Sequence, residues 1–258
     1  MPDSTSVLAE IIAHKHEEIA ERKSATSLAE LERSVEPGSG NFLKSLTGGG
    51  LRLITELKPA SPTAGVLKPQ PDIKSILSSY NKYAAAISVL TDMRYFGGSL
   101  NLLSDVVHYT RLPVLCKDFI LDVFQIYEAR LKGAEAILII VKALDDERLA
   151  HLHSTTLELG MTPVVEIQNE KELHRALDVT PEVILINNRD LDNLQIDLKT
   201  TERLAPLVPD WICTVSASGI ENRQDIERLL PYCSRFLIGS VLMKATDLEG
   251  KLKELTGQ

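Results

Sequence analysis

The sequence predicts an α/β fold, and specifically a (β/α)8 barrel preceded by a helical extension. Eight short apolar runs, rich in valine, isoleucine and leucine, recur between residues 51 and 258 and alternate with helical stretches. Such runs are typical of parallel strands covered on both faces, and regular alternation with helices indicates a parallel sheet. The length of 258 residues suits one barrel. We therefore expect a single domain, with residues 1–50 as the extension and residues 51–258 as the barrel.

An open, doubly wound sheet is the alternative fold. Sheets of that kind commonly carry a glycine-rich phosphate-binding turn after their first strand. Neither G-x-G-x-x-G nor a P-loop follows the first predicted strand here, which favours the closed barrel.

The extension is predicted to contain three helices. The first spans Val7 to Lys23, the second opens at Ser27 with Glu30 completing a capping box, and the third covers Asn41 to Leu46. The first helix sets an apolar stripe against a charged one. The charged stripe comprises Glu10, Lys15, Glu17, Glu18 and Arg22. We interpret the extension as a packing cap on the barrel, and the alternative is that it also closes part of a ligand site.

The first barrel strand, Leu53–Leu57, ends in an acid and an amine. Side chains on a strand alternate between its two faces, so Glu56 and Lys58 leave the same face as neighbours. Pro59 then ends the ladder because it has no N–H to donate. Charged groups here are costly in a core unless they act there, although a plain ion pair at a strand end is the alternative interpretation.

The other strands and the helices between them follow in regular order. Strands are predicted at Ala86–Leu90, Pro113–Leu115, Ala136–Ile140, Pro163–Ile167, Val183–Ile186, Ile212–Val215 and Phe236–Ile238. Residues that favour helix starts precede the intervening helices at Asp72, Ser99, Asp122, Asp145–Asp146, Asn169, Glu221–Asn222 and Asp247.

Composition narrows the possible partners and the compartment. A net charge of −8 and a pI of about 5.3 disfavour binding to nucleic acid or to an anionic membrane. No apolar run approaches the roughly 20 residues that span a bilayer, and the N-terminus lacks the basic region of a signal peptide. The cysteines, Cys116, Cys213 and Cys233, have no C-x-x-C spacing and indicate buried thiols in a reducing compartment. We therefore expect a cytoplasmic protein.

No metal site is indicated by the histidines. All of them fall on predicted helices, away from the strand ends where barrel active sites lie. They are His14, His16, His108, His151, His153 and His174.

Polar side chains follow most of the predicted strands at their C-terminal ends, where barrels of this kind build their active sites. Those with ionisable or amide groups are Glu56, Lys58, Lys117, Glu166, Asn187 and Arg189. A mixed cluster of carboxylates and amines suggests tuned acid–base chemistry. After the last two strands, Ser218-Gly219 and Gly239-Ser240 stand where barrels hold phosphate on backbone N–H groups. A small phosphorylated ligand is therefore expected.

Motifs along essentially the whole chain resemble the indole-3-glycerol phosphate synthase family. In order they are Leu-Ile-Thr-Glu-Leu-Lys-Pro-Ala-Ser-Pro from residue 53, Ser-Val-Leu-Thr-Asp from 88, Tyr-Phe-Gly-Gly-Ser from 95, Leu-Cys-Lys-Asp-Phe-Ile-Leu-Asp from 115, Val-Val-Glu-Ile from 164, Ile-Asn-Asn-Arg-Asp-Leu from 186, Ser-Gly-Ile from 218 and Leu-Ile-Gly-Ser from 237. The sister barrel, phosphoribosylanthranilate isomerase, is shorter and lacks both the extension and the Lys-Asp-Phe motif. Because the chain ends after the eighth unit, no fused isomerase is expected.

The resemblance implies a carboxy-lyase of tryptophan biosynthesis that uses no cofactor. Its substrate would be 1-(2-carboxyphenylamino)-1-deoxy-D-ribulose 5-phosphate, and its products indole-3-glycerol phosphate, carbon dioxide and water. By resemblance Lys117 is the general acid of ring closure, and Glu166 the carboxylate that stabilises positive charge on the ring nitrogen. The resemblance also implies that Lys58 would bind the substrate carboxylate and protonate the leaving hydroxyl. Glu56 would keep the lysines ionised and serve as base in dehydration.

The remaining site residues are also implied by the resemblance. Asn187, Arg189 and Ser218 would orient the substrate's hydroxyls and carboxylate. Phosphate and other substrate contacts would come from Ser61, Gly219, Gly239 and Ser240. The aromatic ring would be walled by Pro62, Phe96, Phe119, Leu138, Leu191 and Ile238. The loop from Pro62 to Pro71 resembles a lid, with a plain linker as the alternative.

Two positions depart from the family pattern. The family usually has glutamate where this chain has Ala217, and often a basic residue where it has Pro59. Two other functions therefore stay open. One is a phosphosugar isomerase on the same barrel, and the other is a non-catalytic barrel that binds an anthranilate-like or sugar-phosphate ligand. A monomer is compatible with the sequence, which does not define an oligomeric state.

Overall fold

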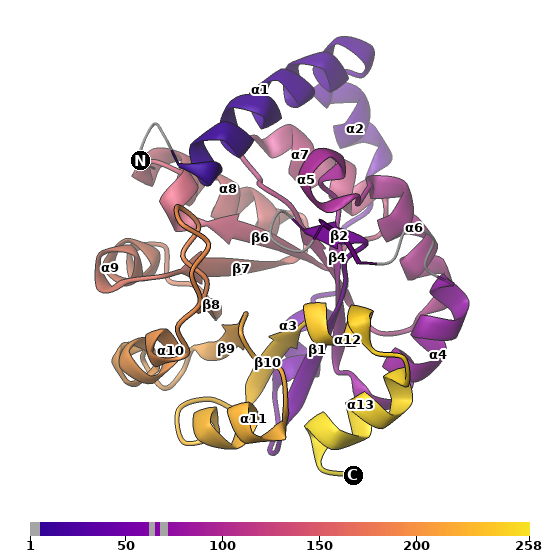
Figure 1. Cartoon of the computed structure of the whole chain (residues 1–258). Helices are drawn as coiled ribbons and strands as arrows, with labels where there is room; N and C mark the ends of the chain where they lie inside the picture. The colour runs from indigo at the N-terminus through magenta and orange to yellow at the C-terminus, as the bar shows by residue number, and fades with distance from the viewer. Residues whose placement is uncertain (1–5, 62–64, 68–71) are drawn as a thin grey trace.

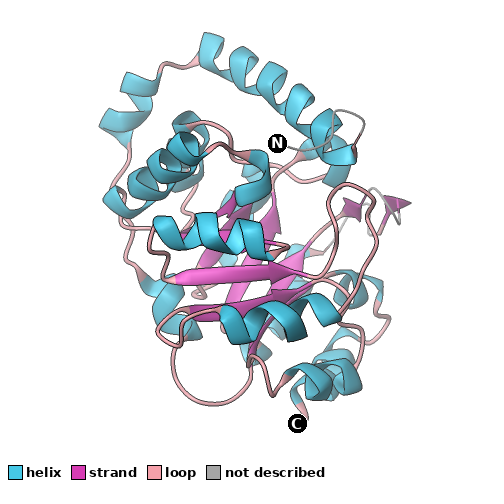
Figure 2. Ribbon diagram, turned by 90° about the vertical axis from the view of Figure 1, so that its left-hand side faces the viewer, coloured by secondary structure: helices cyan, strands magenta, loops and turns pink. Residues whose placement is uncertain are grey.

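The computed structural model describes residues 6–61, 65–67 and 72–258. Eight parallel strands close into a barrel in the order β1-β10-β9-β8-β7-β6-β5-β4, and helices surround it (Figures 1 and 2). The strands are β1 (Arg52–Leu57), β4 (Ala86–Leu90), β5 (Val114–Lys117), β6 (Ala136–Ile140), β7 (Thr162–Ile167), β8 (Val183–Asn187), β9 (Cys213–Ala217) and β10 (Arg235–Ile238). All eight predicted strands are confirmed, each with its ends within two residues of the predicted positions.

The barrel closes where its first strand meets both the second and the last. Ile54 on β1 pairs with Ala86 on β4 and with Leu237 on β10. Strands β4, β6, β7 and β8 are buried along their whole length, as expected for parallel strands covered by helices. The closed order excludes the open, doubly wound alternative.

The outer helices start at the predicted caps, except α10 (Lys199–Leu204), for which no cap was predicted and whose preceding residue, Leu198, makes no side-chain capping hydrogen bond. They are α4 (Ile73–Tyr83), α6 (Leu100–Tyr109), α7 (Val123–Leu131), α8 (Asp146–Glu158), α9 (Glu170–Asp178), α10 (Lys199–Leu204), α11 (Arg223–Leu229) and α13 (Leu248–Thr256), with short helical turns at η1 (Val141–Ala143), η2 (Ala205–Leu207) and α12 (Ser240–Lys244). The predicted capping side chains accept N–H bonds from the first turn; they are Asp72, Ser99, Asp122, Asp145, Asn169, Asn222 and Asp247. Within the described residues, no helix is long and apolar enough to cross a membrane.

The extension forms the three predicted helices, α1 (Val7–Ala25), α2 (Leu28–Ser34) and α3 (Asn41–Leu46). The capping box of Ser27 and Glu30 is present at the start of α2. Helices α1 and α2 pack against α7 on one side of the barrel (Figure 1). The sequence grouped Lys15 with the charged residues of α1, but this side chain is fully buried. Its ammonium pairs with Asp92 and Asp118 on the barrel loops.

Several short elements were not expected from the sequence, η1, η2 and α12 among them. Helix α5 (Met93–Phe96) follows β4, and a two-stranded sheet joins β2 (Ala60–Ser61) to β3 (Gly65–Val66). Of the predicted lid, residues 62–64 and 68–71 lie outside the described residues, so the lid stays a prediction.

Candidate active site

A cavity of about 300 Å³ opens at the C-terminal ends of the strands. All eight barrel strands contribute to its lining, through Glu56, Leu90, Lys117, Leu138, Ile140, Glu166, Asn187, Ala217, Leu237 and Ile238. Parallel strands in a closed barrel end at one rim, so side chains distant in sequence converge there. This cavity has the size and position of a ligand site.

Two lysine–carboxylate pairs lie in this cavity. The Lys58 ammonium is 2.7 Å from Glu56 Oε1, and the Lys117 ammonium is 3.7 Å from Glu166 Oε2. Both carboxylates are almost completely buried, whereas both lysines keep part of their surface open to the cavity. Each pair can therefore present a proton donor and a proton acceptor to a bound molecule.

The electrostatics of the cavity favour an ionised Glu56. Burial by itself raises the pKa of this carboxyl, but the positive charges of Lys58, Lys117 and Arg189 outweigh burial and hold its pKa below the ordinary value. Burial lowers the pKa of the Arg189 guanidinium, and the charge on Glu56 partly offsets this effect. Negative charge from Glu56 thus supports the cations that line the same cavity.

Hydrogen bonds fix the orientation of Glu166 and Asn187. Asn187 Nδ2 donates to Glu166 Oε1 over 2.9 Å, and the Arg189 backbone N–H donates to Asn187 Oδ1 over 3.0 Å. Asn187 therefore uses both ends of its amide within the site. The Arg189 side chain donates to the carbonyl of Leu194 and lines the cavity.

The neighbouring residue, Asn188, ties the loops beneath the site together. Its Nδ2 donates to Ser216 Oγ and to the carbonyls of Ala217 and Ser218, at 3.0–3.1 Å. Its Oδ1 accepts from the N–H and hydroxyl of Thr201. The buried amide of Asn188 thus joins the start of α10 to the end of β9 and to the loop that carries Ser218.

The loops after β9 and β10 bring backbone close to the cavity. Ser218 and Gly219 both have a left-handed backbone, with φ of 68° and 80°, a conformation that is uncommon for serine. A Cβ on Gly219 would meet Ile196 and Leu198, so glycine suits both the backbone and the space. Gly239 and Ser240 line the same end of the cavity, and Lys244 lies one helical turn further along α12. Small residues and a cation at this end suit an anionic group.

Part of the cavity lining is apolar. The rings of Phe96 and Phe119 lie with their centroids 6.1 Å apart, and Leu138, Leu191 and Ile238 complete this wall. A second cavity of about 60 Å³ lies beside it, lined by these rings and by Val7, Leu8 and Ile11 of α1. The extension is therefore both a packing cap and part of the wall around the site.

Nearly all of the predicted site residues line the main cavity. They are Glu56, Lys58, Phe96, Lys117, Phe119, Leu138, Glu166, Asn187, Arg189, Leu191, Ser218, Gly219, Ile238, Gly239 and Ser240. Ser61 lines the second cavity, and Pro62 lies outside the described residues. Glu56 and Lys58 do leave one face of their strand as a pair, as the alternation predicts.

Sequence reasoning missed several residues at the site. Asp118 and Glu221 line the cavity. The position of Asp118 directly after Lys117 could have identified it as a site residue. Lys244 also lines the cavity, and no predicted element covered this residue. The apolar residues of α1 that line the second cavity could not be identified from the sequence. An amphipathic stripe does not reveal which part of a barrel it covers.

Comparisons with known proteins agree with one another. The family profile described as indole-3-glycerol phosphate synthase matches residues 8–255. A protein named indole-3-glycerol phosphate synthase from Nocardioides sp. is 42% identical over 257 residues, covering 98% of both chains. The tryptophan biosynthesis protein TrpCF of Vibrio parahaemolyticus is 41% identical over 258 residues, covering 98% of this chain and 53% of that protein. The chain thus spans about half the length of its TrpCF relatives.

Solved structures share the fold at low identity. A 3-hexulose-6-phosphate synthase from Salmonella typhimurium superposes with a TM-score of 0.63 at 12% identity, covering 80% of this chain and 97% of that chain. A chain of the tryptophan synthase complex from Pyrococcus furiosus gives 0.61 at 16% identity, covering 81% and 99%. These similarities concern the barrel alone. The family profile and the full-length relative establish that this chain belongs to the indole-3-glycerol phosphate synthase family.

Proposed function

We propose that this protein is an indole-3-glycerol phosphate synthase. It would convert 1-(2-carboxyphenylamino)-1-deoxy-D-ribulose 5-phosphate to indole-3-glycerol phosphate, carbon dioxide and water in tryptophan biosynthesis, in the cytoplasm. The observation that carries the proposal is the presence of two lysine–carboxylate pairs, Lys58–Glu56 and Lys117–Glu166, in one cavity. The proposed reaction contains two steps that need a proton donor, and each pair offers one.

Ring closure is the first of these steps. The ring carbon that carries the carboxylate attacks the ribulose carbonyl, and a carbon–carbon bond forms as the carbonyl oxygen takes a proton from Lys117. The electron pair leaves the ring, and positive charge develops on the ring nitrogen, where Glu166 would stabilise it. Asn187, hydrogen-bonded to Glu166 over 2.9 Å, would keep that carboxylate oriented.

Loss of carbon dioxide returns the electron pair to the ring. In the final step the new hydroxyl leaves as water after protonation by Lys58, and Glu56 accepts a proton from the substrate. The lowered pKa of Glu56 supports its role as an ionised base. Each step moves protons and bonding electrons within the substrate and these side chains, so the atoms balance without a redox partner.

The cavity lining offers both an apolar wall and small residues with a cation, and these suit the aromatic ring and the phosphate of this substrate. Phe96 and Phe119 give an apolar wall for the carboxyphenyl ring. Gly219, Gly239 and Ser240 would receive the phosphate, with Lys244 as an additional cation. Arg189 and Ser218 would orient the carboxylate and the hydroxyls between them.

The two rival functions use less of this site. A phosphosugar isomerase needs one acid–base pair and leaves the second without a role. A non-catalytic barrel needs no buried pair at all, and Ala217 in place of the family's glutamate is the feature that favours it. Both predict that the carboxyphenylamino substrate is not converted.

The test is to mix the purified protein with the substrate and follow the fluorescence of the indole product. We expect turnover, and a loss of about 10²- to 10⁴-fold in kcat for Lys117→Ala, since that is the usual contribution of a positioned acid. Substrate binding without turnover in the parent protein would overturn the proposal in favour of the non-catalytic barrel.

A further inference from the structure

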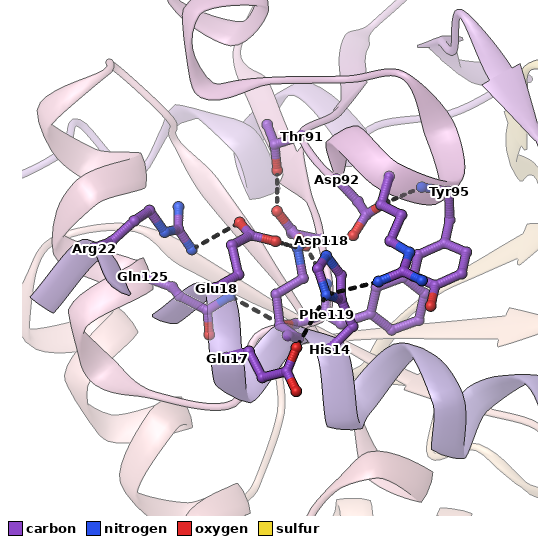
Figure 3. Close-up of polar contacts among 12 residues, drawn as sticks. His14, Glu17, Glu18, Arg22, Thr91, Asp92, Tyr95, Asp118, Phe119 and Gln125 are labelled. Carbon is purple, nitrogen blue, oxygen red and sulfur yellow. Dashed lines mark hydrogen bonds and ion pairs between the residues drawn. The ribbon is translucent and has the colours of Figure 1, made fainter. Parts of the chain in front are cut away.

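A buried lysine on the extension pairs with three carboxylates that have no role in the steps of the proposed reaction. The Lys15 ammonium lies 2.8 Å from Glu18, 2.8 Å from Asp92 and 2.9 Å from Asp118. The Lys15 side chain is completely buried, as is that of Asp92. Figure 3 shows Asp92 and Asp118 of the barrel gathered against Glu18 of α1. Helix α1 is thus joined to the barrel by one shared cation.

One of these carboxylates belongs to the loop that carries the proposed acid. Asp118 lies between Lys117 and Phe119, both of which line the cavity. Its Oδ1 accepts the N–H of Phe119 over 2.8 Å, and its Oδ2 accepts the Thr91 hydroxyl over 2.7 Å. The position of Asp118 therefore sets the backbone on which the acid and one aromatic ring are mounted.

The other carboxylate holds the adjacent loop. Asp92 Oδ1 accepts the N–H of Tyr95 over 2.7 Å and so caps α5, and its carbonyl accepts the N–H of Gly98. Helix α5 carries Phe96, the second ring of the apolar wall. The loops that carry Phe96 and Phe119 are thus both held by an ion pair to Lys15.

Among the described residues, the ion pairs of Asp92 and Asp118 are both formed with Lys15. Arg22 of α1 lies 3.3 Å from Glu18 and 3.1 Å from Glu128, and no ion pair to Asp92 or Asp118 is formed by it among the described residues. Burial alone lowers the pKa of the Lys15 ammonium, but the charges of Asp118 and Asp92 outweigh burial and raise it. Removing this cation leaves two buried like charges side by side, and they repel.

We propose that Lys15 is a positioning residue for the reaction proposed above: it holds Asp118 and Asp92 together and thereby places Lys117, Phe119 and Phe96 around the substrate. The inference rests on the proposed function. The extension then does more than cap the barrel, because it sets the orientation of the acid. A displacement of the acid by about 1 Å can cost on the order of 10²-fold in rate.

The test compares Lys15→Met, Lys15→Arg and a matched control, Lys23→Met. Lys23 lies on the same helix and pairs with Asp122 over 2.6 Å, but it is 40% exposed and does not line the cavity. The kcat of each variant is measured per site that binds the product, indole-3-glycerol phosphate, at a temperature where circular dichroism shows it folded. This readout separates a loss of positioning from a loss of folded protein.

We expect kcat per binding site to fall about 10- to 100-fold in Lys15→Met, to recover at least partly in Lys15→Arg, and to stay within about twofold of the parent in Lys23→Met. A parent value of kcat in folded Lys15→Met would overturn the inference while leaving the proposed function intact. An inactive parent protein would instead reject the proposed function.

A second variant keeps the inference testable if Lys15→Met does not fold. Asp118→Asn has the same shape and can still accept the Phe119 N–H, but it lacks the charge that Lys15 neutralises. We expect kcat to fall in this variant too, by about tenfold or more. In the double variant Lys15→Arg/Asp118→Asn the losses should not add, because both changes act through one contact. Additive losses would show that Lys15 does not act through Asp118.

Discussion

The backbone of Gly239 lies directly against the side chain of Glu56. A Cβ at position 239 would lie 2.8 Å from both Cβ and Cδ of Glu56, a separation that real side chains do not adopt. Glycine is therefore required here for the close approach of the end of β10 to Glu56 on β1.

Gly239→Ala should displace Glu56 from Lys58 and lower kcat/KM by about tenfold to 10²-fold, the range expected for a shift of about 1 Å in a catalytic group. Gly49→Ala is the matched control, since a Cβ there would meet nothing within 4 Å. Steady-state kinetics of both variants test this. A Gly239→Ala protein with parent kinetics would mean that the Glu56–Lys58 pair does not contribute to the rate.

Glu166→Gln should lower kcat by about 10²-fold or more while the protein stays folded. Glutamine keeps the shape of the side chain but removes the negative charge that faces Lys117 and accepts from Asn187. Glu172→Gln provides the comparison, because Glu172 is also buried but does not line the cavity. Single-turnover measurements would report the effect on ring closure, and equal kcat in both variants would contradict the assigned role.

Asn188→Ala should destabilise the protein by at least about 2 kcal/mol, since a buried polar group left without a partner costs about 1–3 kcal/mol. Five partner groups on Thr201, Ser216, Ala217 and Ser218 would lose their contact with this amide. Urea unfolding followed by circular dichroism measures the change. Asn193→Ala, on the exposed part of the same loop, should change the free energy of unfolding far less.

The free energy of unfolding should fall below about pH 6.5, the ordinary pKa of histidine, because His153 is buried in its neutral form. Burial lowers its pKa in the folded state, and its Nε2 has no hydrogen-bond partner among the described residues. Below pH 6.5 the unfolded chain binds this proton and the folded protein does not. Stability is therefore present above that pH and is lost as the pH falls toward the folded-state pKa.

The pH effect of His153 is isolated by comparison with His153→Phe, which cannot titrate. Thermal unfolding between pH 7.5 and pH 5 should show a larger fall in Tm for the parent than for the variant. Other groups, such as Glu128 and Glu172 with raised pKa values, titrate equally in both proteins. Parallel Tm curves would show that His153 is not the group responsible.

Much of the fold followed from local sequence. The strands are short, nearly continuous apolar runs, as is typical of parallel strands covered on both faces. The caps from Asp72 to Asp247 are residues whose side chains accept hydrogen bonds from the first turn of a helix. The acid–base residues were also accessible, because they stand at strand ends such as Glu56 and Glu166. Hydrophobic periodicity and helix capping depend on residues that are neighbours in the sequence, so these features can be predicted from the sequence alone.

The sequence by itself determined the eight strands, most of the helix starts and which polar side chains reach the rim of the barrel. Tertiary structure alone decided the environment of Lys15, because its partners Asp92 and Asp118 lie about 80 and 100 residues away and helical periodicity cannot say which side of a helix meets charged loops. It also decided why residue 239 is glycine, since the reason is a side chain on another strand. Contacts between distant segments arise only when the barrel closes, and they set the roles that local patterns leave open.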